Sequence, residues 1–385
     1  MTRRACAAVA IAAALLAVTA AGCASVTSQA RSGLAPPPPP SLATTLETAD
    51  GAWAVTELGG SAARHNNFWQ LFQRPAGSTT WRLVTPPGVA SNGGMVMAGL
   101  GGPSLIVGFR PSQLLKFTPL ATTRDSGSTW SPGVLPADLA NVPDALAAAP
   151  GGGRLAALLA GGRIDQARPG ATTWTPLTSV HALAAAPASR RCSPDMVTAV
   201  SFSPSSDPVL GAACTRPGAV GIFSYAAGAW RMAGPVLPAF LASRQVQVLR
   251  LTNTMSGEAA LLAARSGRSV ELLVARTSDG THWTLSRPLN LGAPAVRASG
   301  FAAAGSAWVL IDNGQAYTIS GQSAAWRRLP RPPAATAALA FGPAASVEAL
   351  AARGSTLTDW ELTRGSRAWR QAQVLLVPVK YGSSG

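Results

Sequence analysis

The side chains in this sequence that are best suited to chemistry are arginines. Lys116 and Lys380 are the only lysines, so arginine supplies nearly all of the basic side chains behind the formal net charge of +15. A guanidinium group binds carboxylate, phosphate or sulfate oxygens through two parallel hydrogen bonds. The charge therefore favours an anionic partner such as phospholipid headgroups, wall polymers or acidic glycans. A bias in genomic base composition would produce the same excess, so charge alone establishes no site.

Groups that could catalyse hydrolysis are scarce, with 16 acidic residues, 3 His and 3 Tyr. A glycosidase needs two carboxyl groups about 5 to 9.5 Å apart in a cleft. The nearest pairs along the chain are Glu47 with Asp50 and Asp359 with Glu361, and a solvated pair on one strand face also explains the second. The sequence contains no Ser/His/Asp arrangement, phosphate-binding loop or zinc motif. We predict no catalytic residue, metal or cofactor.

Tryptophans recur along the chain at intervals of 43 to 56 residues, each after a turn rich in Gly, Ser and Thr. They are Trp81, Trp130, Trp174, Trp230, Trp283, Trp326 and Trp369. A period of this length is typical of a four-stranded β-propeller blade. The repeat predicts an all-β fold, a seven-bladed β-propeller of four-stranded antiparallel blades that occupies residues 44–385.

Alternating apolar strands and turn residues fill each unit in the same order. In the sixth unit we predict strands over 296–304, 306–311 and 315–320, with Trp326 opening the fourth. The fifth and seventh units repeat the pattern, with strands predicted over 245–252, 259–264, 270–276, 335–341, 346–352 and 357–363. No unit shows helical periodicity.

Two of the turns before Trp share a longer motif. Residues 123–130, TRDSGSTW, read Ser/Thr-x-Asp-x-Gly-x-x-Trp, and residues 277–283, TSDGTHW, are one residue shorter. In such a turn the Asp carboxylate accepts backbone N–H groups, Gly takes a positive φ and Trp packs between sheets. The structural residues would be Asp125, Gly127, Trp130, Asp279, Gly280 and Trp283.

By these motifs residues 44–381 resemble the Asp-box (BNR, sialidase-like) repeat propellers. The resemblance implies that each Asp-box turn joins the third and fourth strands, on the face away from the ligand. The resemblance also suggests sialidase activity. In that family three arginines bind the substrate carboxylate, a Tyr assisted by Glu is the nucleophile, and an Asp is the acid/base. Tyr225 and Tyr317 fall on third strands just before a Trp turn, a poor position for a central nucleophile, so the activity is not carried over.

Turns between the second and third strands lie on the opposite face, and most of them contain Arg. This candidate basic rim consists of Arg64, Arg110, Arg163, Arg216, Arg265, Arg268 and Arg353. Connections between units add Arg244, Arg297 and Arg331. The rim could bind an anionic ligand, although surface hairpins of an Arg-rich protein contain Arg in any case. The segment 65–69, HNNFW, could add a stacking platform or be a simple turn and strand start.

The N-terminus is typical of an exported lipoprotein. Arg3 and Arg4 precede an uncharged apolar run over residues 5–21, which is short for a membrane span. Residues 20–23, AAGC, look like a bacterial lipobox, so we predict a signal peptide over 1–22 and a lipid on Cys23. Ordinary cleavage nearby is the alternative, and the export route, Sec or Tat, stays open. Residues 23–43 include five consecutive prolines and read as a semi-rigid linker.

Two cysteines remain for the folded domain, Cys192 and Cys214. An even number of cysteines in a protein of an oxidising compartment predicts a disulfide between them. A metal site is the weaker interpretation, because His181 has no partner at ligand spacing.

The leading hypothesis is a lipid-anchored extracytoplasmic binding or scaffolding module, monomeric, for an anionic protein, glycan or membrane surface. A glycoside hydrolase of sialidase-like type and an assembly factor for an envelope complex are the alternatives. Outside the cell, nucleic acid is the least expected partner.

The lipobox generates a direct prediction. Cys23→Ser removes the thiol that would carry the lipid, so we expect the protein to leave the membrane fraction and to incorporate no labelled fatty acid. Fractionation and metabolic labelling of cells expressing either form measure this. Continued fatty-acid labelling of the variant would reject Cys23 as the site.

Overall fold

The computed structural model describes residues 43–60, 67–88, 93–110 and 115–378. The chain divides into two compact units, 1–35 and 36–385, and every described residue belongs to the second. The predicted signal peptide, Cys23, nearly all of the linker and Arg64 lie outside the described residues. Among those residues no helix is long and apolar enough to cross a membrane.

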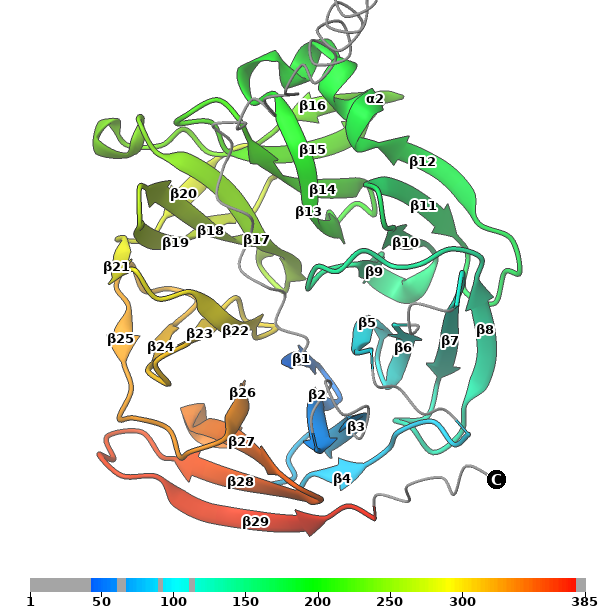
Figure 1. The fold of residues 1–385 in the computed structure, drawn as a ribbon, viewed down its shortest axis with the longest axis vertical. Helices are drawn as coiled ribbons and strands as arrows, with labels where there is room; N and C mark the ends of the chain where they lie inside the picture. Colours follow the sequence, from blue (N-terminus) through cyan, green and yellow to red (C-terminus); the bar gives the residue numbers. More distant parts are fainter. Residues whose placement is uncertain (1–42, 61–66, 89–92, 111–114, 379–385) are drawn as a thin grey trace, which may run out of the picture. The chain divides into compact units, whose positions relative to one another are not determined.

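Antiparallel strands make up most of the described chain (Figure 1). Three sheets each have four strands in chain order. They are β5 (Met95–Gly101), β6 (Ser104–Phe109), β7 (Thr118–Thr123) and β8 (Ser131–Leu135); β9 (Leu146–Ala148), β10 (Leu155–Leu158), β11 (Arg163–Ala167) and β12 (Thr175–Ser179); and β26 (Thr336–Phe341), β27 (Val347–Arg353), β28 (Thr356–Leu362) and β29 (Arg370–Leu376).

Two larger sheets each join two runs of consecutive strands, four with four in one sheet and four with five in the other. The eight-stranded sheet contains β1 (Thr44–Thr48), β2 (Gly51–Gly59), β3 (Asn67–Pro75) and β4 (Arg82–Leu83), with β22 (Val296–Phe301), β23 (Ala307–Ile311), β24 (Ala316–Ile319) and β25 (Arg327–Arg328). Its halves meet at a parallel pairing of Leu46 with Phe301. The nine-stranded sheet contains β13 (Pro194–Phe202), β14 (Pro208–Cys214), β15 (Gly221–Ala226), β16 (Ala229–Met232), β17 (Gln245–Thr254), β18 (Gly257–Ser266), β19 (Ser269–Thr277), β20 (Trp283–Leu285) and β21 (Leu289–Gly292). Its halves meet where Ala213 pairs with Gln247.

Helices are short and lie in the connections. The structure has one α-helical segment, α2 (Val180–Ala185), among the described residues, and the Ser179 side chain caps it by accepting from the Ala182 N–H. Short 3-10 turns are η2 (Pro150–Gly152), η3 (Pro187–Arg191), η4 (Ala239–Leu241) and η5 (Pro343–Ala345). The expectation of an all-β domain is confirmed.

The first strand of each run lies nearest the centre of the second unit (Figure 1). β1 contacts β5, β22 and β26, and β9 contacts β5 and β13. Short side chains allow this crowding, as in β26, TAALAF, and β9, LAA. Apolar side chains between neighbouring sheets form the core, for example Val96 and Leu120 of one sheet with Leu155 and Leu158 of the next.

Each of the seven periodic tryptophans stands at or directly before the fourth strand of its run. Trp283 donates from Nε1 to the Ala233 carbonyl at 2.6 Å, and Trp369 donates to the Pro330 carbonyl at 3.1 Å. Both acceptors belong to the preceding run. The indole therefore ties the outer edge of one sheet to its neighbour while its ring packs against the core.

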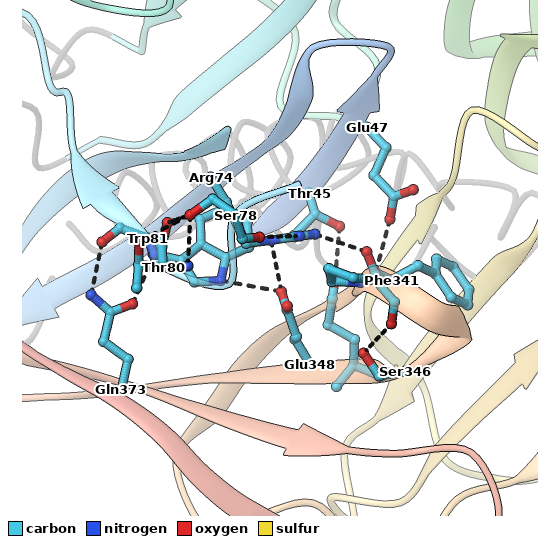
Figure 2. Close-up of polar contacts among 12 residues, drawn as sticks. Thr45, Glu47, Arg74, Ser78, Thr80, Trp81, Phe341, Ser346, Glu348 and Gln373 are labelled. Atoms are coloured by element: carbon cyan, nitrogen blue, oxygen red, sulfur yellow. Dashed lines mark hydrogen bonds and ion pairs between the residues drawn. The ribbon is translucent and has the colours of Figure 1, made fainter. Parts of the chain in front are cut away.

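A seam joins the first run, β1–β4, to the last, β26–β29 (Figure 2). One backbone hydrogen bond crosses it among the described residues, from the Gly59 N–H to the Gly354 carbonyl at 2.7 Å. Most of the polar contact comes from side chains. Arg74 Nε lies 3.1 Å from Glu348, and Trp81 Nε1 donates to the same carboxylate at 3.2 Å.

Further hydrogen bonds extend the seam on both sides. Gln373 accepts from the Trp81 N–H at 2.7 Å and donates to the Trp81 carbonyl at 2.9 Å, as a neighbouring strand would (Figure 2). Glu47 accepts from the Phe341 N–H at 2.8 Å, and Thr45 donates to the Leu339 carbonyl at 2.6 Å. The first and last sheets are thus held by side chains from both.

Cys192 and Cys214 form the predicted disulfide, with both residues fully buried. It joins the end of η3 to the end of β14, across a sequence separation of 22 residues. The Arg216 N–H also donates to the Cys192 carbonyl at 3.2 Å. The crosslink thereby ties the connection before β13 to the turn after β14.

Removing this crosslink should destabilise the domain. Closing a loop of this length lowers the entropy of the unfolded chain, so the Cys192→Ala/Cys214→Ala variant should lose about 3 kcal/mol of unfolding free energy. Urea unfolding of both proteins, with and without reductant, measures the loss. Reductant should affect only the wild type, and an unchanged wild-type midpoint after verified reduction would contradict the expectation.

Candidate functional site

The rim arginines lie at one end of the sheets, where the second strand of each run meets the third. We call this the arginine end. Arg163 opens β11, Arg216 lies between β14 and β15, Arg265 and Arg268 flank the turn from β18 to β19, and Arg353 closes β27. Because neighbouring strands are antiparallel and the first strands share one direction, these turns point to the same side.

Arg110 does not belong to this exposed set, which corrects the expectation from the sequence. It is only 6% exposed, and its two Nη atoms donate to Asn141 Oδ1 and to the Val142 carbonyl. Burial lowers the pKa of its guanidinium to about 10. Arg110 braces the connection that leads into β9 and offers no free donor pair to a ligand.

Other basic side chains at this end are partly engaged. Arg163 pairs with Asp165 at 2.9 Å, and Arg244 lies 3.6 Å from Glu271. Arg265 is half-buried, which lowers the pKa of its guanidinium. Arg297 and Arg331 donate to the carbonyls of Thr336 and Asn313. Four of these arginines thus have polar partners within the fold, and Arg163 and Arg331 remain exposed.

Arg216, Arg268 and Arg353 are the rim residues that are exposed and make no ion pair among the described residues. Each stands in a turn, where the side chain can reach solvent. A guanidinium in this state keeps its full set of donors for an incoming anion.

The two turns with the Asp-containing motif, residues 123–130 and 277–283, lie at the opposite end, between third and fourth strands. Asp125 accepts from the N–H and hydroxyl of Thr129 and from Thr123, and these hydrogen bonds lower its pKa to about 2. Asp279 accepts from the N–H groups of Thr281 and His282 and from His282 Nδ1, which lowers its pKa further. Both carboxylates are occupied within their own turns.

A cavity of about 430 Å³ occupies the centre, lined by residues of β1, β5, β9, β13, β17 and β22 and their adjoining turns. Its principal charged feature is Arg250 of β17. The guanidinium donates to Asp144 at 2.9 Å, to Ser299 at 3.2 Å and to Thr44 at 3.0 Å. One side chain thus links four segments around the centre, and all three of its nitrogens are used.

Sequence reasoning did not single out Arg250 or Asp144. The available signal was an arginine inside the otherwise apolar or neutral strand QVQVLRLTNT and an aspartate just before LAA. A buried arginine in a strand predicts a carboxylate partner, but the sequence does not indicate which Asp or Glu that partner is.

Three carboxyl groups gather at the seam. Burial raises the pKa of Glu47 to about 7 and that of Asp359 to about 8, and it also raises the pKa of Glu348. The charge of Glu348 adds to the shift of Asp359, while Arg74 opposes it. Asp359 is 2% exposed, so the suggestion of a solvated Asp359–Glu361 pair is wrong for Asp359.

Two of these carboxyl groups have partners across the seam, and Glu47 also lines the central cavity. Glu348 is engaged by Arg74 and Trp81, and Glu47 by the Phe341 N–H. No group of three or more His, Cys, Asp or Glu placed to hold a metal ion occurs in the described ranges.

No family model matches this sequence, and no curated protein matches it. Solved structures resemble it in fold. YCF48 from Cyanidioschyzon merolae matches with a TM-score of 0.51 and 14% identity, covering 86% of this chain and 98% of that one. A protein from Lactobacillus plantarum matches with a TM-score of 0.51 and 13% identity, covering 85% and 96%.

A further match is the GH74 xyloglucanase from Xanthomonas campestris, with a TM-score of 0.52 and 13% identity. The match covers 82% of this chain and 51% of the xyloglucanase. The neighbours are β-propeller proteins, and at this identity the likeness shows the fold alone. The chain is accordingly an all-β protein of β-propeller type.

Asp359 provides a test of the seam's electrostatics. A carboxyl group whose pKa is higher in the folded state binds a proton more tightly there than in the unfolded chain. Its contribution to the free energy of unfolding is therefore fully present below the unfolded-state pKa of about 4. That stability is lost as the pH rises toward about 8. Asp359→Asn should therefore be more stable than the wild type at pH 9, by roughly 1–3 kcal/mol. Its free energy of unfolding should also fall less steeply between pH 5 and pH 9, because about one titrating group has been removed.

Urea unfolding across this pH range measures the difference. Asp312→Asn, which alters an exposed carboxylate in the turn between β23 and β24, is the matched control and should leave the pH dependence unchanged. Equal pH dependence in wild type and Asp359→Asn would show that Asp359 does not titrate in this range.

Proposed function

We propose that this protein is a seven-bladed β-propeller, anchored outside the cytoplasm by a lipid on Cys23, that binds an anionic partner at its arginine end. The blade number is supported by the seven tryptophans, each at the start of a fourth strand, and by the three sheets that have four strands each. The two larger sheets divide at single pairings, the eight-stranded sheet into two runs of four and the nine-stranded sheet into runs of four and five, in which β20 and β21 both pair with β19.

The observation that carries the binding function is the state of Arg216, Arg268 and Arg353. They project from three different turns of the arginine end, exposed and without carboxylate partners among the described residues. Several turns of a rigid scaffold that display the same charged group can contact one polyanion simultaneously, and the contacts reinforce each other.

A glycoside hydrolase requires two carboxyl groups facing one cleft. Of the three described carboxyl groups at the seam, Glu348 is bound by Arg74 and Trp81 and Glu47 by a backbone N–H, while Asp359 is buried. This engagement favours a binding module over an enzyme. If the anionic partner is an acidic protein, the binding module would act as an assembly factor for an envelope complex.

The binding proposal can be tested with a soluble polyanion. The triple variant Arg216→Gln/Arg268→Gln/Arg353→Gln removes the free guanidinium groups, so its affinity for heparin should fall roughly tenfold or more and lose most of its salt dependence. Titration of the purified full-length protein at several salt concentrations measures both.

A matched control removes the same charge from the opposite end. Arg124, Arg364 and Arg367 are exposed residues of turns between third and fourth strands, and their replacement by Gln should leave heparin affinity nearly unchanged. Equal losses in both triple variants would mean that net charge, and not the arginine end, determines binding.

A further inference from the structure

Two large apolar side chains stand in solvent at the arginine end. They belong to the loop between β16 and β17, where Val236 is 91% exposed and Phe240 in η4 is 61% exposed. An apolar side chain exposed to this degree projects from the surface. Exposed large apolar side chains that lie close together often mark an interaction site.

Backbone hydrogen bonds tie this loop to its basic neighbours. The Gly218 N–H donates to the Arg244 carbonyl at 2.7 Å, which fixes the end of the loop beside the turn that carries Arg216. The Arg216 N–H in turn donates to Cys192, directly after Arg190 and Arg191 of η3. On the other side Gln245 pairs with Arg265, next to the turn with Arg268.

The resulting surface is basic. We call it the β16–β17 patch, and it comprises residues 187–195, 214–219, 233–245 and 265–271. Its charged side chains are Arg190, Arg191, Arg216, Arg244, Arg265 and Arg268, with Asp195 and Glu271. Since Arg244 pairs with Glu271, the exposed part of the patch is dominated by unpaired guanidinium groups.

Exposed apolar side chains ringed by arginines match the chemistry of an anionic bilayer surface. The apolar groups enter the boundary between headgroups and acyl chains, and the guanidinium groups bind lipid phosphates. Arginine suits this depth because its methylene stem lies against apolar material while its head remains with the phosphates.

The first described strand begins at the end of the sheets that carries this patch. β1 begins at Thr44 and runs parallel to β22, so it starts at the same end as the other first strands. For β17 that end carries the turn with Arg268. A predicted linker of about 20 residues spans at most roughly 65 Å, so it tethers the domain within that distance of the bilayer.

We propose that the β16–β17 patch docks on the anionic membrane surface, with Val236 and Phe240 inserted between lipid headgroups. This inference rests on the proposed function, because it names the anionic partner of the arginine end. Docking orients the domain, with its arginine end against the bilayer and its Asp-box end facing away.

A single-site fluorophore tests the docking in the full-length lipidated protein. Cys192 and Cys214 are bridged, so Val236→Cys or Phe240→Cys places one environment-sensitive label in the patch. The control is Met255→Cys, which labels an apolar residue that is 79% exposed in the turn from β17 to β18 at the opposite end. Each protein is reconstituted into vesicles of phosphatidylcholine with or without phosphatidylglycerol.

We expect a blue-shifted and brighter emission from the labels at 236 and 240 in vesicles with phosphatidylglycerol, and an aqueous emission from the label at 255. The shift should be lost at high ionic strength and in the Arg216→Gln/Arg268→Gln background. Aqueous emission from all three labels in both vesicles would overturn the docking, as would equal shifts at 236, 240 and 255.

The heparin titration separates this failure from that of the proposed function. If the patch labels stay aqueous while the rim triple variant still loses heparin binding, the arginine end binds a soluble anionic partner, such as an acidic protein, and not the bilayer. If heparin binding is also unaffected, the proposed function fails with it.

Discussion

The buried ion pair between Arg74 and Glu348 is the central charge contact of the seam, and the neighbouring polar and apolar contacts between the first and last sheets are arranged around it. β1–β4 and β26–β29 are each continuous in the chain, so no strand is exchanged between the first and last sheets. A single backbone hydrogen bond, Gly59 to Gly354, crosses their boundary among the described residues. The buried guanidinium and Trp81 together satisfy Glu348, and losing one partner of such a pair typically costs about 3–5 kcal/mol because a charge is left buried.

The surface is basic because the chain has 31 basic and 16 acidic residues, and several of the carboxylates are engaged within the fold. Asp144 and Glu348 neutralise buried arginines, and Asp125 and Asp279 accept hydrogen bonds within their own turns. Those carboxylates have partners within the fold, whereas Arg216, Arg268 and Arg353 make no ion pair among the described residues. These three guanidinium groups stand in solvent at the arginine end, where an anion can approach them.

Strand positions could be predicted from the sequence with good accuracy in the later units. The fifth unit was expected over 245–252, 259–264 and 270–276, and the structure has Gln245–Thr254, Gly257–Ser266 and Ser269–Thr277. The rim was harder to predict, because turn position says which end a residue occupies but not whether it is buried. Arg110 and Arg216 occupy equivalent turns, yet one is covered by Asn141 and Val142 while the other is exposed.

Local chemistry was determined by the sequence alone: the tryptophan period, the turns that satisfy their own Asp, and the pairing of two cysteines that had no other partner. These features depend on residues close together in the chain or on simple parity. Tertiary structure decided the rest, namely which arginines face solvent, that Arg250 links four segments, and that residues as distant as Arg74 and Glu348 meet. Burial and charge pairing arise from contacts between separate sheets, and no local pattern encodes which sheets those are.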